Sequence, residues 1–102
     1  MNDTVSNAIF PEQAKQASDF LRILANENRL QILCLLIEHG EMSVGQINAM
    51  TTLSQSALSQ HLAKMRDEGL VSYGRQSQTL YYRICDDRVA RIIMVLKEIF
   101  CP

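Results

Sequence analysis

The order of patterns between residues 43 and 83 constrains the fold of this chain more than any other feature. Two short helical patterns with a tight joint are followed by two β-type runs around a polar loop. The first helix begins at Ser43-Val44-Gly45-Gln46, which has the form of a capping box. The second begins after Ser54, a favoured N-cap residue, and is closed by Gly69. This order predicts a winged helix-turn-helix, whose second helix can lie in a DNA major groove.

The second of these helices is expected to have two chemically different faces. One face carries apolar residues at spacings of three and four, namely Ala57, Leu58, Leu62 and Met65. The other face carries amides, hydroxyls and one cation, namely Gln55, Ser56, Ser59, Gln60 and Lys64. Amides and hydroxyls suit base edges and phosphates, whereas a protein-binding surface would be more apolar. We therefore predict that this helix binds double-stranded DNA.

Base contacts are expected from the polar side chains at the start and middle of this helix. Gln55 and Gln60 can each form two hydrogen bonds with an adenine. Ser56 and Ser59 can reach several base edges. Gln55 and Ser56 could instead serve only to cap the start of the helix. The N-cap residue Ser54 belongs to the same set of candidate DNA-binding residues.

Contacts with the DNA backbone are expected from cationic side chains near this face. Lys64 and Arg66 favour phosphates over bases, although either could be merely solvated. Arg75 lies at the tip of the expected wing and should reach the backbone or the minor groove. His61 is expected to pack at the helix edge and to touch a phosphate at most.

The remaining helical patterns place a buried helix at the centre and one helix near each end. A helix is expected from Pro11 to about Ala25, with the proline as its first residue. A second is expected over residues 27–38, where the apolar run should make it the buried central helix. A last helix, capped by Asp86 or Asp87, should end near Phe100.

These patterns together predict a mainly α fold with a small β-wing. The expected strands, 70–73 and 80–85, are rich in branched and aromatic residues. We predict about five helices and one two-stranded antiparallel hairpin, in a single domain over residues 11–102. Residues 1–10 are expected to form a flexible N-terminus.

Composition and charge narrow the classes of function. The chain has 102 residues, of which 47% are hydrophobic, so it has one modest core and is not disordered. No apolar run approaches the ~18 to 20 residues that cross a bilayer, and the first residues do not form a secretory signal. A cytoplasmic protein without a membrane partner is expected.

The net charge is −1, yet no acidic residue occurs between Met42 and Arg66. This distribution is compatible with DNA binding, with modest non-specific affinity.

The last helix indicates a second copy of the chain. Nine of the twelve residues from Val89 to Phe100 are apolar, and the others are Arg91, Lys97 and Glu98. Nine apolar side chains are more than one helix face can bury against a small core. We prefer the interpretation that one side packs inward while the other meets a partner subunit, with help from the first helix. The alternative is a helix that is buried within the monomer. A homodimer through the N- and C-terminal helices would match a two-fold DNA site.

Over about residues 18–101 the chain resembles the ArsR family of small dimeric winged-helix repressors. The matching segments are Leu24–Leu33, Leu53–Leu62 and Met65–Val71. The resemblance implies a transcriptional repressor that binds operator DNA. Its metal-sensing members carry thiolates where this chain has Ser43 and Gly45, and their last-helix histidines have no counterpart here. We therefore expect no metal site and no cofactor.

A pair of cysteines is similar to the sulfide- and redox-responsive branch of that family, the BigR, SqrR and HlyU type. Cys34 lies in the central helix and Cys101 just beyond the last one. The resemblance implies that a disulfide or a bridge of extra sulfur atoms joins them and loosens the repressor from DNA. The inducer would be a small-molecule oxidant or sulfane sulfur. From residue chemistry alone, Cys34 is a packing residue and Cys101 a frayed terminal thiol. Cys85 is interpreted as structural.

Three hypotheses of different classes remain open from the sequence. The first is a transcriptional repressor switched by its thiols. The second is a winged-helix DNA-binding regulator with inert cysteines, which acts constitutively or as an anti-repressor. The third is a protein-interaction module that has lost DNA binding. An enzyme is not expected, because no set of nucleophile, base and orienting residue and no phosphate-binding loop occurs.

Overall fold

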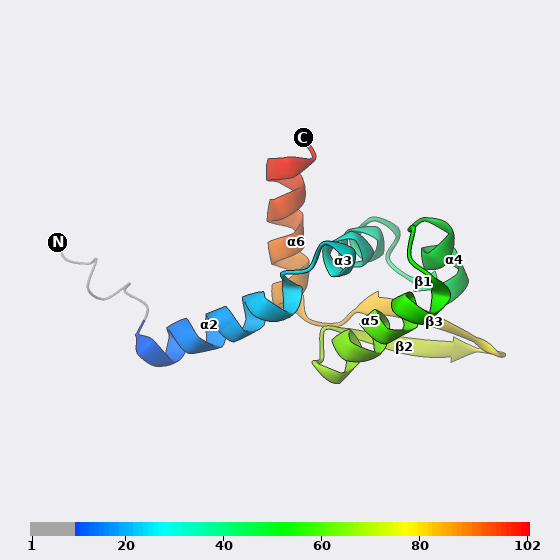
Figure 1. The fold of residues 1–102 in the computed structure, drawn as a ribbon, viewed down its shortest axis with the longest axis horizontal. Helices are drawn as coiled ribbons and strands as arrows, with labels where there is room; N and C mark the ends of the chain where they lie inside the picture. Colours follow the sequence, from blue (N-terminus) through cyan, green and yellow to red (C-terminus); the bar gives the residue numbers. More distant parts are fainter. Residues whose placement is uncertain (1–9) are drawn as a thin grey trace.

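The computed structural model describes residues 10–102, and the expectation for the N-terminus falls mainly on residues 1–9, which lie outside this part. Figure 1 shows the helix-turn-helix and the wing on one side of the molecule, and α2 and α6 on the other. The elements are α2 (Pro11–Leu24), α3 (Glu27–His39), β1 (Met42–Ser43), α4 (Val44–Ala49), α5 (Gln55–Asp67), β2 (Val71–Gln76), β3 (Thr79–Ile84) and α6 (Asp87–Phe100). The prediction of a mainly α winged helix-turn-helix is confirmed.

Side-chain caps fix where four of the helices begin. The Asn26 side chain accepts from two backbone N–H groups of α3, and the Ser54 hydroxyl accepts from the N–H of Ala57 at 3.1 Å. Ser43 and Gln46 form both halves of the predicted capping box at α4. Of the two aspartates that could begin the last helix, Asp86 is the N-cap. Each cap satisfies backbone donors that the first turn of a helix leaves unpaired.

The wing differs from the prediction in having a third strand. β1 pairs antiparallel with β3, which places Met42 opposite Tyr82 and gives the strand order β1-β3-β2. The ladder between β2 and β3 continues to the pair Gln76 and Thr79. The turn therefore contains only Ser77 and Gln78, and the loop between the strands is shorter than expected. Ser77 adopts a positive φ of 56°, which a two-residue hairpin turn commonly requires. The polar residues before and after this turn therefore belong to the strands.

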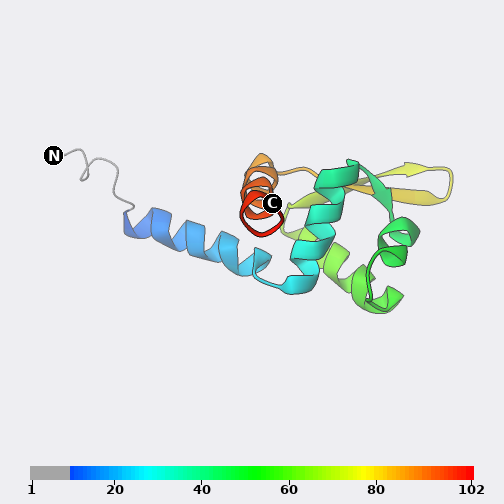
Figure 2. The ribbon, with the colours of Figure 1, turned by 90° about the horizontal axis from the view of Figure 1, so that it is seen from above.

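α3 forms the centre of the core, as predicted. Figure 2 shows α3 crossing between α6 and α5, with α2 extending away from this body. The fully buried side chains come from α3, α4, α5, α6, the start of β2 and the residue just before β2: Ile32, Leu33, Leu36, Ile47, Leu58, Leu62, Met65, Leu70, Val71, Val89 and Ile93. α2 contributes little to this core, because Leu24 is its one buried residue. The core thus holds the helix-turn-helix and α6 together and leaves most of α2 exposed.

Candidate DNA interface and cysteine cavity

α5, called the recognition helix below because the sequence predicts that it binds DNA, presents the two faces that the sequence predicts. Leu58, Leu62 and Met65 are fully buried and attach the helix to the core. The polar side chains of the other face are exposed: Ser54, Gln55, Ser56, Ser59, Gln60 and Lys64. Because the buried face fixes the helix, its exposed amides and hydroxyls are held outward on a rigid support.

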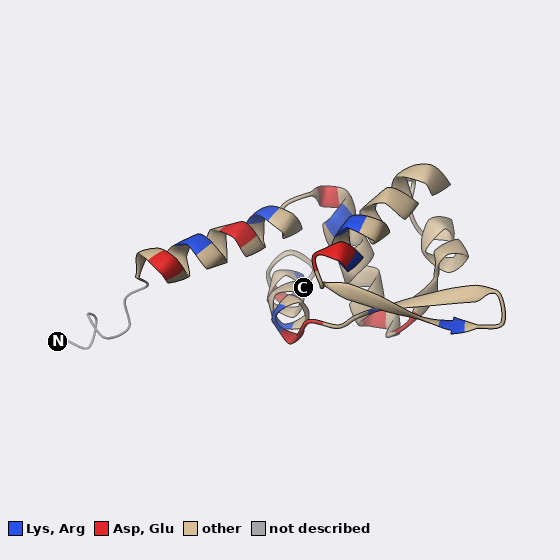
Figure 3. Ribbon diagram, turned by 90° about the horizontal axis from the view of Figure 1, so that it is seen from below, with Lys and Arg blue, Asp and Glu red and all other residues tan. Residues whose placement is uncertain are grey.

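The cations at the end of α5 are offset by neighbouring groups. Lys64 Nζ lies 3.4 Å from Glu68 Oε1, and Arg66 Nη2 lies 3.7 Å from Asp67 Oδ1. The Arg66 guanidinium also lies over the Tyr73 ring of β2, 5.5 Å from its centroid. In Figure 3 the acidic residues of this region gather at the end of α5, and the rest of α4 and α5 carries none. Exposed ion pairs of this kind are weak, so a phosphate can replace the carboxylate.

Arg75 is the cation that the wing offers to a ligand. It lies on β2 opposite Leu80, next to the turn, and is exposed. Among residues 10–102, no carboxylate lies within ion-pair distance of Arg75, whereas Arg83 on β3 lies 3.6 Å from Glu41. The wing tip therefore carries a positive charge that internal pairing does not offset.

His61 faces inward to α3, which the sequence did not indicate. Arg29 Nε donates a hydrogen bond to His61 Nδ1 at 3.3 Å, and the imidazole is half-buried. Burial and then the charge of Arg29 lower the pKa of His61 below its ordinary value of 6.5. The ring is therefore neutral at pH 7, with its proton on Nε2. A neutral imidazole attracts phosphate weakly, and this contact stays a prediction.

Cys34 and Cys101 line one cavity between α3 and α6. The cavity has a volume of about 230 Å³, and its other lining residues are mostly apolar: Leu30, Ile93, Leu96, Lys97 and Phe100. Both cysteines are free thiols; Cys34 is partly buried and Cys101 is exposed. Burial raises the pKa of the Cys34 thiol, an effect that Lys97 opposes and Cys101 and Glu38 reinforce. Cys34 is thus a protonated thiol at neutral pH.

Cys85 lies apart from this pair. Its Sγ donates to the Gly69 carbonyl at 3.4 Å, at the junction between α5 and the wing, and it does not line the cavity of Cys34.

In residues 10–102, no three His, Cys, Asp or Glu side chains are grouped so that they could hold a metal ion. Within the same range, no helix combines the length and the apolar character that crossing a membrane requires.

Comparison with known proteins decides the family. Residues 26–73 match the model of bacterial regulatory proteins of the arsR family. The chain is 42% identical to the transcriptional activator HlyU of Vibrio cholerae, over 88% of this chain and 82% of that protein. It is 44% identical to the HTH-type transcriptional regulator YgaV of Escherichia coli, over 87% of this chain and 90% of that protein. This chain belongs to the ArsR family.

Solved structures agree with this ArsR-family assignment. The structure of HlyU from Vibrio cholerae superimposes with a TM-score of 0.84 at 41% identity, covering 91% of this chain and all of that one. The fold and the relatives are those of transcription regulators and not of enzymes. The protein is therefore a DNA-binding transcriptional regulator, and regulators of this family commonly act as dimers.

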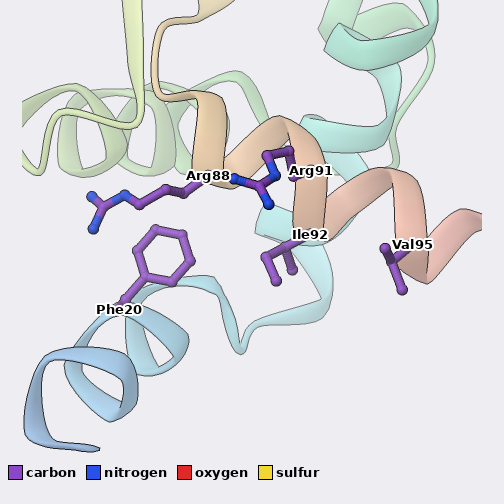
Figure 4. Close-up of a pocket in the computed structure, with 5 residues that line it drawn as sticks. All are labelled: Phe20, Arg88, Arg91, Ile92 and Val95. Carbon is purple, nitrogen blue, oxygen red and sulfur yellow. The ribbon is translucent and has the colours of Figure 1, made fainter. Parts of the chain in front are cut away.

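In this ArsR-family chain, α2 and α6 leave an apolar surface without a partner. Met94 and Val95 of α6 are 54% and 49% exposed, and Leu21 of α2 is similarly exposed. Figure 4 shows Phe20 of α2 facing Arg88 and Ile92 of α6, in a groove of about 330 Å³ that Arg91 and Val95 also line. Exposed apolar side chains gathered on neighbouring helices are typical of an interface between proteins.

Two functional candidates in this ArsR-family chain were missed by the sequence analysis. Arg29 contacts the recognition helix through His61, and Tyr73 supports Arg66 from the wing. Arg29 lies within the segment that resembles the family, but its partner is 32 residues away in the sequence. Local spacing cannot reveal a contact of this kind.

Proposed function

We propose that this protein is a homodimeric repressor that binds two half-sites of operator DNA and releases them when Cys34 and Cys101 become bridged. The observation that carries the proposal is the shared cavity of the two thiols between α3 and α6. α3 packs against both α6 and the wing strand β3, so a bridge at this point acts on the body that supports α5. The direction of regulation rests on the resemblance described above. Relatives include an activator and the biofilm growth-associated repressor of Agrobacterium fabrum, 37% identical over 88% of this chain and 76% of that protein.

In this proposal α5 lies in the major groove and the wing follows the backbone. Gln55, Ser56, Ser59 and Gln60 contact bases. The other contacts are with phosphate, sugar or minor groove, from Ser54, His61, Lys64, Arg66 and Arg75. His61 is the weakest member of this set, because its ring is neutral and partly covered by α3.

The two subunits meet through α2 and α6. Changing Val95 to aspartate would place a charge in the middle of this seam, where burial removes its hydration. We expect the dissociation constant of the dimer, measured by sedimentation equilibrium, to rise roughly tenfold or more. Ser77→Asp adds the same charge at the wing turn and should leave assembly unchanged. Equal dissociation constants for wild type and Val95→Asp would contradict this seam.

Bridging proceeds from the exposed thiol to the covered one. With hydrogen peroxide, the Cys101 thiolate forms a sulfenic acid and releases hydroxide, and the Cys34 thiol then displaces water to give the disulfide. With a sulfane sulfur donor, a persulfide forms on Cys101 and the donor leaves as its thiol. Attack of Cys34 on that persulfide gives the disulfide and releases hydrogen sulfide. Cys101 reacts first because it is exposed, whereas burial keeps Cys34 protonated.

A cysteine-variant series tests the switch. The reduced protein first selects a duplex from a random pool, and fluorescence anisotropy then gives its affinity before and after polysulfide or peroxide. We expect bridging to weaken binding by about 5- to 150-fold in wild type, which is the usual range for coupled sites. Cys34→Ser and Cys101→Ser should not respond, and the matched control Cys85→Ser should respond like wild type. Mass spectrometry identifies the bridge and counts its sulfur atoms.

The alternative is a regulator with the same DNA-binding surface and inert cysteines, acting constitutively or as an anti-repressor. The raised pKa of Cys34 favours this alternative, because a protonated thiol is a poor nucleophile. An equal response of wild type and Cys34→Ser to both oxidants would support the alternative and exclude the proposed switch.

A further inference from the structure

Arg29 connects three helices through one guanidinium group. It lies on α3, and its Nη1 donates to the carbonyl of Ile23 in the last turn of α2 at 3.0 Å. Its Nε donates to His61 Nδ1 in the middle of α5 at 3.3 Å. Both bonds are partly shielded from solvent. One planar guanidinium group therefore joins α2 to the recognition helix.

The direction of α2 depends on few other contacts. The helix projects away from the rest of the molecule in both Figure 1 and Figure 2, and Leu24 is its one buried residue. Phe20 and Ile23 also pack against the core as partly buried side chains, and the ring of Phe20 lies 4.7 Å from the guanidinium carbon of Arg88 on α6. The carbonyls at the end of a helix have no partner within the helix, so Arg29 supplies one for Ile23.

We infer that Arg29 is a positioning residue that fixes the direction of α2 relative to α5, and so sets the distance between the two recognition helices of the dimer. This inference rests on the proposed function, in which α2 belongs to the seam between subunits. The two donors of a guanidinium have a fixed mutual geometry, whereas a lysine ammonium has no such fork. A change in the angle of α2 would therefore turn α5 of one subunit away from the second half-site.

The spacing of half-sites separates positioning from general stability. Two-fold operators place half-sites about one helical turn apart, ~10 to 10.5 base pairs. A residue that only stabilised the fold would lower affinity equally at every spacing. A positioning residue would instead make the protein less selective between spacings, while binding to a single half-site changed little.

The experiment uses duplexes whose half-site spacing changes in steps of one base pair, with a single half-site as reference. We expect a sharp optimum for wild type. For Arg29→Met, the ratio of best to worst affinity should fall by about fivefold or more. Arg29→Lys should behave like Arg29→Met, because charge without the fork does not hold both acceptors. If the Arg29 variants fold poorly, His61→Leu breaks the bond to α5. Because His61 is also a candidate phosphate contact, only its ratio of best to worst affinity is compared, since the loss of a phosphate contact lowers affinity equally at every spacing.

Arg22→Met is the matched control. Arg22 belongs to the same end of α2 and is exposed, and its guanidinium pairs with Asp19 on the same helix. It should keep the spacing optimum of wild type. An optimum equally sharp in Arg29→Met, Arg29→Lys and wild type would overturn the role of Arg29 while leaving the proposed function intact. A wild-type protein without any spacing preference would overturn binding to paired half-sites, and this inference with it.

Discussion

Replacing Gln60 with alanine is expected to weaken operator binding by about 5- to 150-fold while leaving the free energy of unfolding nearly unchanged. Gln60 is exposed on α5, and its amide can donate to and accept from one adenine. Loss of one such contact costs ~1 to 3 kcal/mol, which gives that range of affinities. Anisotropy titrations at a single, stated salt concentration measure the effect, since salt alone changes affinity strongly.

Gln31→Ala provides the control for this substitution. Gln31 is also an exposed helical glutamine, but it lies on α3 and not on the recognition helix. Its removal should leave operator affinity unchanged. A panel of duplexes with single base changes adds a second readout, because Gln60→Ala should tolerate replacement of the adenine that wild type requires. If Gln60→Ala kept both the affinity and the base preferences of wild type, the proposed orientation of α5 in the groove would be wrong.

Leu58→Ala should lower the free energy of unfolding, which Gln60→Ala should leave nearly unchanged. Leu58 lies two residues away on the same helix and is fully buried. Truncating a buried leucine to alanine removes apolar contacts and leaves a cavity, at a cost of about 2 to 5 kcal/mol in the free energy of unfolding. Urea denaturation at a fixed protomer concentration measures this loss, since dimer stability depends on concentration.

Ser59→Ala is the matched neighbour for the stability measurement. Its hydroxyl is exposed, so the free energy of unfolding should change by no more than about 0.5 kcal/mol. Its operator affinity should fall if Ser59 contacts a base. Equal unfolding free energies for Leu58→Ala and Ser59→Ala would show that α5 does not pack as described.

The elements of this fold were predictable wherever the signal is local. Ser43 and Ser54 predict where α4 and α5 begin, because an N-cap needs only a hydroxyl and a backbone N–H a few residues later. The two faces of α5 follow from helical periodicity in the same way. β1 was missed because Met42–Ser43 is too short to show an alternating pattern, and it is a strand only because β3 lies beside it.

The site was predictable in its residue types but not in its long-range contacts. The sequence identified Cys34 and Cys101 through a family resemblance, whereas their common cavity depends on how α6 lies across α3. Likewise, the sequence placed His61 at the edge of the recognition helix without indicating that Arg29 would hold its ring toward α3. Contacts between distant segments arise from packing, which local spacing does not encode.

The short strand β1 has a consequence for how the regulator can release its operator. Ser43 ends β1 and is also the N-cap of α4, so the sheet and the helix-turn-helix share a residue without an intervening hinge. In the proposed complex, each subunit would therefore present the wing and α4 to the double helix as one unit, with α5 attached to the same core through its buried side chains. In the proposed mechanism, a signal that releases the operator would then change the orientation of one subunit relative to the other, because β1 ties the wing to the start of the helix-turn-helix.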